Sequence, residues 1–171
     1  MKEEPVSHSS LRKNVKKHSG LRLVKGFFKC YDLVLAKELL YTIMTASMKR
    51  KARICLEPSD VLDFYLSVRS FVRGCYLLQF RHKKWLLSEP EEITSSLMLG
   101  SLSEEEYEYP FRVFKNAFRE YTIEELDGFI TEVSYFSLGA YDGLPHGNVV
   151  TPFIHLNKMM DAAWVVLERV E

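Results

Sequence analysis

The chain has 171 residues, 47% of them hydrophobic, and equal numbers of basic and acidic residues. That apolar content is enough for a sizeable core, which excludes a disordered chain, and no apolar run approaches the ~18 residues of a membrane-spanning helix. The zero net charge is unevenly divided, since residues 1–85 carry 18 Lys or Arg against 7 Asp or Glu, and residues 86–171 carry 5 against 16. We expect either two halves that attract each other or an acidic partner for the basic half.

The first 20 residues are predicted to form a flexible basic tail. They are polar, and Leu11 and Val15 are their only apolar pair at helical spacing. So few apolar side chains cannot offset the entropy lost when such a segment becomes ordered. We expect residues 21–171 to form a single helical domain.

A long first helix is predicted at residues 21–50, because apolar residues recur there every three or four positions. Lys49 and Arg50 at its end suit the negative pole of the helix dipole. Residues 54–58 then lead into the next helix, and so short a connection predicts that the two helices run antiparallel.

The helix predicted at residues 59–85 is the one around which we expect the bundle to be organised. Ser59 is its expected cap. Its main stripe consists of Val61, Phe64, Tyr65, Val68, Phe71, Val72, Cys75 and Leu78. A second stripe consists of Leu62, Leu66, Tyr76, Leu77 and Phe80. Together the stripes make most of the perimeter apolar, so we expect neighbouring helices to enclose this one. Ser67, Ser70 and Gly74 form a seam of small residues, on which another backbone can lie close.

The second half of the chain carries clear helix start signals. A short helix is expected at residues 90–99, and capping boxes at Ser103 and Thr122 predict the next two starts. Pro110 is expected to kink the first of these helices or to begin it anew. Thr151 is the expected cap of the last helix. The sequence therefore predicts an all-α fold, an up-and-down bundle of about four long helices with one or two short ones.

Two sets of basic residues are candidate anion-binding sites. In an antiparallel pair of helices, Arg22 and Lys25 fall at the same end as Arg81, Lys83 and Lys84, which predicts a basic pole able to contact phosphates. The alternative is that these cations are solvated helix ends facing the acidic half of the chain.

Arg69 and Arg73 are the second set, and they share a face of the predicted central helix. Partly buried arginines require a carboxylate or a phosphate. We favour a structural pair with an acid of this chain over a bound anion, because buried charges are normally paired. The acids considered are Glu38, Glu120, Glu132 and Asp161.

The Gly- and Pro-rich stretch at residues 140–151 is the third candidate. Asp142, His146 and the nearby His155 are residue types that bind metals. Their spacing matches no established ligand pattern, so we favour ordinary turn chemistry and expect no metal or other cofactor.

These features predict a non-catalytic helical interaction module that acts through self-association or a protein partner. The alternative is a nucleic-acid-associated accessory protein that uses the basic pole. We expect no membrane partner. Three cysteines, Cys30, Cys55 and Cys75, form no CxxC pair and leave one unpaired under any pairing, which favours a reducing compartment and a cytoplasmic location.

Overall fold

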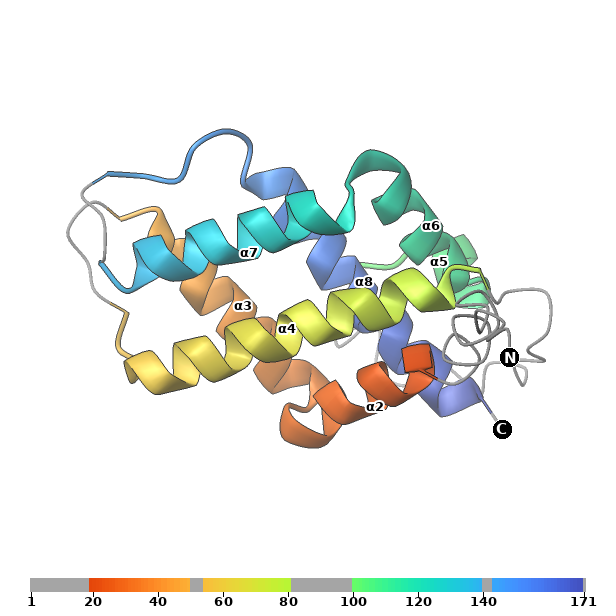
Figure 1. Ribbon diagram of the computed structural model, residues 1–171. Helices are drawn as coiled ribbons and strands as arrows, with labels where there is room; N and C mark the ends of the chain where they lie inside the picture. The colour runs from red at the N-terminus through yellow and green to blue at the C-terminus, as the bar shows by residue number, and fades with distance from the viewer. Residues whose placement is uncertain (1–18, 50–53, 81–99, 140–142, 171) are drawn as a thin grey trace, which may run out of the picture.

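The computed structural model describes residues 19–49, 54–80, 100–139 and 143–170, which form an all-α helical bundle (Figure 1). This confirms the fold class predicted from the sequence. The helices of the described residues are α2 (Ser19–Cys30), α3 (Leu33–Ser47), α4 (Pro58–Leu78), α5 (Glu104–Glu108), α6 (Phe111–Glu120), α7 (Ile123–Ser137) and α8 (Val150–Arg169). The expected tail lies outside the described residues except for its last two positions, which begin α2. The short helix expected at residues 90–99 lies outside them entirely.

The prediction of one helix at residues 21–50 is wrong, because the chain turns between α2 and α3. Asp32 adopts an extended conformation, with φ −65° and ψ 168°, and its carboxylate accepts a hydrogen bond from the Leu35 amide at 2.8 Å. An aspartate in this role satisfies an orphan amide and starts a new helix. As a result α2 packs mainly against α4, whereas α3 packs against α7 and α8.

Helix α4 buries its main stripe but is not enclosed by neighbours. Every residue of that stripe is buried except Tyr65, which is partly buried. Leu62 and Leu66 of the second stripe are 47% and 54% exposed, and Phe80, just after the helix, is 67% exposed. The predicted cap is also wrong, since the helix begins at Pro58 and Ser59 lies within its first turn.

The enclosed helix is α8, which passes behind α4 in Figure 1. Residues 159–163 are all buried, so the middle of α8 is covered on every side. It packs against α3 and α6, with smaller contacts to α2 and α5. Its start also differs from the prediction. Thr151 is already helical, and Asn148 accepts hydrogen bonds from the amides of Val150 (3.1 Å) and Thr151 (3.2 Å).

The α2–α4 pair is antiparallel and unusually close at one point. Gly20 lies beside Gly74 and Leu78, and Phe27, further along α2, stacks on Phe71 with ring centres 4.7 Å apart. A Cβ on Gly74 would lie only 3.0 Å from the carbonyl oxygen of Gly20. The two backbones therefore meet at the Gly74 end of the small-residue seam predicted on this helix.

Helices α5, α6 and α7 follow their start signals. Both predicted capping boxes form, with Ser103 and Thr122 accepting from the third helical amide. Pro110 separates α5 from α6, as expected for a residue that cannot continue the helical hydrogen bonding. Gly139 follows α7 with φ 69°, a conformation that glycine adopts without strain.

Helix α5 buries none of its own residues and is held by basic residues of α8. Lys158 donates to both carboxylate oxygens of Glu106, at 2.7 and 2.9 Å, and Arg169 donates to the carbonyl of Tyr107 at 2.8 Å. Burial alone would raise the pKa of the Glu106 carboxyl. The hydrogen bonds from Lys158 and Ser103 outweigh burial and lower this pKa below its ordinary value.

Candidate functional site

An open groove lies between α2 and α4, beside the point where the two helices meet. Its volume is about 340 Å³. The lining residues are Arg22, Leu23, Gly26, Phe27, Leu66, Ser67 and Ser70. Small side chains create the groove, because Gly26 has no atom within 4 Å of the place where a Cβ would stand, and Ser67 and Ser70 face it from α4. The α2–α4 groove is thus a consequence of the seam that was visible in the sequence.

The floor of the α2–α4 groove is apolar and held in place by the core. Phe27 is buried, and its ring packs at a tilt against those of Phe71 and Phe64, with ring centres 4.7 and 6.3 Å away. On the α4 side, Leu66 presents an exposed apolar side chain, and the Ser70 hydroxyl donates to the Leu66 carbonyl at 3.2 Å. The Ser70 hydroxyl therefore has a partner already, and the exposed Leu66 favours an apolar occupant.

Arg22 lines the α2–α4 groove, and Lys25 and Lys29 continue its face of α2 beyond the residues that line the groove. Arg22, Lys25 and Lys29 are exposed and spaced so that they share one face of the helix. Helix α2 contains no acidic residue. Within the described part of the chain, none of these three cations takes part in an ion pair. Their charge is available to an occupant of the groove.

The far end of the α2–α4 groove has acidic neighbours. The pKa of the Tyr31 hydroxyl is raised above its ordinary value. Burial is the largest cause, and the charges of Asp63 and Asp60 add to it, whereas a hydrogen bond with Ser67 acts in the opposite direction. These two carboxylates therefore lie near Tyr31, where α2 ends and α4 begins. Arg22 therefore lies at one end of the groove, and Asp60 and Asp63 lie near the other end, where Lys29 is in the last turn of α2.

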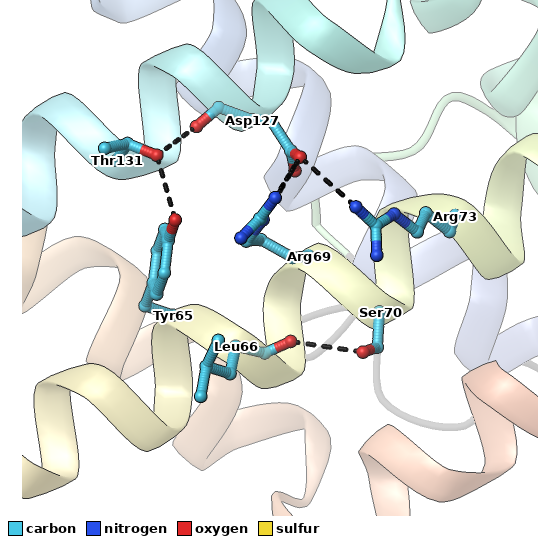
Figure 2. A network of polar contacts seen from close by, with 7 residues as sticks. All are labelled: Tyr65, Leu66, Arg69, Ser70, Arg73, Asp127 and Thr131. Carbon is cyan, nitrogen blue, oxygen red and sulfur yellow. Dashed lines mark hydrogen bonds and ion pairs between the residues drawn. The ribbon is translucent and has the colours of Figure 1, made fainter.

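Arg69 and Arg73 are paired with an acid that the sequence analysis did not consider (Figure 2). The Nε and Nη2 atoms of Arg69 donate to Oδ2 of Asp127 at 3.1 and 2.8 Å, and Nη2 of Arg73 lies 3.6 Å from the same oxygen. The hydrogen bond with Asp127 raises the pKa of Arg69 despite its desolvation. Tyr65 closes the cluster through a 3.1 Å hydrogen bond to Thr131. The carboxylate occupies the place that a bound anion would take.

Within the described residues, none of the four acids considered for Arg69 and Arg73 forms an ion pair with them. Asp161 is fully buried, and its two oxygens accept from Lys37 at 2.7 and 3.0 Å. Ser101 also donates to Asp161. Glu120 and Glu132 pair with histidines instead. The Lys37–Asp161 pair could not be predicted from the sequence, because no local pattern connects residues so far apart in the chain.

The remaining predicted site residues are not brought together by the described structure. The two histidines pair with different acids, His146 with Glu132 at 3.2 Å and His155 with Glu120 at 2.9 Å. Asp142 lies outside the described residues, as do three members of the expected basic pole, Arg81, Lys83 and Lys84. Among the residues that the structure describes, no three metal-binding side chains gather.

Comparison with known protein families, characterised proteins and solved structures gives no match for this chain. In the parts of the chain with described structure, no helix has the length and apolar character needed to cross a membrane.

Proposed function

We propose that this chain is a non-catalytic helical interaction module whose α2–α4 groove receives a helix of a protein chain. The observation that carries the proposal is an open groove with an apolar floor between two antiparallel helices. A third helix completes such a pair by placing apolar side chains into the space between them. Its partner is either another protein or a second copy of the chain.

The surroundings of the α2–α4 groove support a binding role over a catalytic one. Among the described residues that line it, Arg22 is the one charged residue, and none of them carries a carboxylate, imidazole or thiol. Such groups are the usual sources of a nucleophile or a general base. Leu62, exposed one turn before Leu66 on α4, extends the apolar surface along the groove and provides further area for an apolar partner.

The proposal is tested by filling the α2–α4 groove. Leu at position 26 has open space around its Cβ, so Gly26→Leu occupies the groove without displacing the core. Gly128→Leu is the matched control, because Gly128 is equally open but lies in α7. The probe is a neutral ~18-residue helical peptide with leucines on one face, long enough to span about 27 Å.

We expect the peptide, or self-association of the chain, to shift the amide signals of Leu23, Gly26, Ser67 and Ser70 in a ¹⁵N-labelled sample. Gly26→Leu should remove these shifts, and Gly128→Leu should leave them in place. Sedimentation velocity on the chain alone separates self-association from binding of the peptide. Shifts that map elsewhere, or the absence of both kinds of binding, would refute the proposal.

A second candidate is nucleic-acid association through the basic pole. It is supported by the placement of Arg22 and Lys25 at the start of α2, which lies beside the end of α4 at Leu78. For binding of this kind, the logarithm of the affinity should fall linearly with the logarithm of the salt concentration. Titration of the chain with duplex RNA and duplex DNA at several salt concentrations tests it.

We also propose a cytosolic location, because the cysteines are not arranged for cross-linking. Cys75 is buried in α4, and Cys30 and Cys55 are free and exposed. Free exposed thiols suit a reducing compartment. Imaging of a tagged chain in cells tests this placement.

A further inference from the structure

We infer that the helix received by the α2–α4 groove is an acidic amphipathic helix of a partner protein, whose carboxylates lie at one end and face Arg22 and Lys25. This inference rests on the proposed function, since it names the chemistry of the occupant of the same groove. It goes further by fixing the sign of the partner's charge and the end of the groove at which that charge lies.

The charge on α2 is the first observation behind this inference. Arg22 both lines the α2–α4 groove and begins the row that Lys25 and Lys29 continue. No acidic residue of α2 offsets the row, and no ion pair within the described residues neutralises it. Carboxylates on a docked helix would complement these charges at the rim, where they add specificity and speed association.

The apolar floor is the second observation, and it favours a protein helix over nucleic acid. Leu23, Phe27 and Leu66 form a surface that apolar side chains cover well and a phosphate backbone does not. The acids at the far end also count against a polyanion, because Asp60 and Asp63 would repel a phosphate chain that follows the whole groove. A helix with carboxylates only at its Arg22 end meets both ends of the groove favourably.

Cys30 provides a reporter for the test. It is exposed and lies one turn after Gly26 on α2. Cys55→Ser removes the other exposed thiol, and burial raises the pKa of the Cys75 thiol well above its ordinary value, which leaves Cys75 unreactive. A fluorophore on Cys30 of the full chain therefore reports on occupation of the groove.

The experiment titrates this labelled chain with three ~18-residue helical peptides that share one leucine face. The peptides differ at the flanking positions of one end, which carry Glu, Gln or Lys. We expect the Glu peptide to bind about tenfold more tightly than the Lys peptide, a difference of about 1.4 kcal/mol. The Gln peptide should be intermediate, and the difference should shrink as salt is added.

Charge-neutral variants show whether the preference comes from α2. Arg22→Gln with Lys25→Gln should abolish the preference for the Glu peptide and leave the affinity for the Gln peptide nearly unchanged. The matched control, Lys49→Gln with Arg119→Gln, removes the same charge from exposed positions on other parts of the chain. It should keep the preference.

The outcomes separate the inference from the proposed function. If the three peptides bind the groove equally well, the acidic partner is refuted and the interaction module stands. If no peptide binds and the chain instead self-associates in a way that Gly26→Leu blocks, the occupant is a second copy, which also refutes the acidic partner. If duplex RNA binds at the groove and no peptide does, both proposals are wrong.

Discussion

The contact between α2 and α4 makes a sharp prediction about glycine. We expect Gly74→Ala to destabilise the protein and the same change at Gly26 to stabilise it. Both glycines lie inside helices, where replacement by alanine gains about 1 kcal/mol through helix propensity. The two sites differ in the space around the new methyl group, so comparing them separates the effect of packing on stability from that of helix propensity.

The magnitude follows from the neighbours of each site. A Cβ at Gly26 or Gly128 has nothing within 4 Å, so the full gain of about 1 kcal/mol should appear. A Cβ at Gly74 would lie 3.0 Å from the Gly20 carbonyl oxygen, 3.0 Å from Cγ2 of Val24 and 3.1 Å from Cβ of Leu23. These atoms span a full turn of α2, so the whole helix must move to relieve them. Overpacking of this kind costs about 1–3 kcal/mol, which leaves a net loss of about 1 kcal/mol.

Urea unfolding followed by circular dichroism measures the free energy of unfolding of each variant. The free energy of unfolding of the Gly74→Ala variant should be about 2 kcal/mol lower than that of the Gly26→Ala variant. This is the difference between a loss and a gain of ~1 kcal/mol each. For a chain of this size, that corresponds to roughly 4–8 °C in melting temperature. Gly128→Ala should match Gly26→Ala. Equal stabilisation at positions 26 and 74 would show that the two backbones are not in close contact.

Three further predictions concern the core and its ion pairs. Phe71→Ala should lower the free energy of unfolding by about 3–5 kcal/mol, measured by urea unfolding, and a loss below about 1 kcal/mol would place Phe71 outside the core. Lys37→Met leaves Asp161 buried without its cation and should cost about 3 kcal/mol in the same assay, whereas an unchanged stability would mean that the pair is not formed in solution. The pKa of Glu106 is lower in the folded protein, so the unfolded chain takes up this proton at a higher pH than the folded one. The contribution of the Glu106 carboxylate to stability is therefore present above about pH 4.3, and it is lost as the pH falls through the pKa of the folded state. Lys158→Met should therefore cost stability at pH 7 and progressively less below pH ~4, and a cost independent of pH would contradict this origin.

The helix boundaries show how far local sequence reasoning reaches. The capping boxes at Ser103 and Thr122 are local signals, and both helices start where those signals predict. The break at Asp32 was also a local signal, an aspartate placed before an apolar run. It was missed because the residues on either side continue the same three- and four-residue spacing, which does not by itself show that the chain has turned.

The relative burial of the helices could not be predicted in the same way. Periodicity shows which faces are apolar but not which helices meet, so α4 was expected at the centre, a place that α8 occupies. The small residues Ala162 and Ala163 let neighbours approach α8 on sides that carry no large apolar side chain.

The candidate site was likewise predictable only in part. The seam of Ser67, Ser70 and Gly74 was predicted, because small residues on an otherwise bulky helix are visible in sequence. The groove beside it depends on which part of α2 lies opposite. The partner of Arg69 was likewise not predictable, since Asp127 lies 58 positions away and meets it only because α4 packs against α7.

The attachment of α5 has a consequence for the order in which the protein opens. A helix of five residues does not persist alone in water, so α5 keeps its shape only while it is docked on α8. Part of its docking comes from Glu106 accepting from Lys158, and Glu106 also completes the cap of α5. Acid should thus weaken the docking and the cap of α5 in a single step. Amide hydrogens of α5 should exchange through this local opening while those of α8 still require global unfolding, which makes α5 a separate cooperative unit within one bundle.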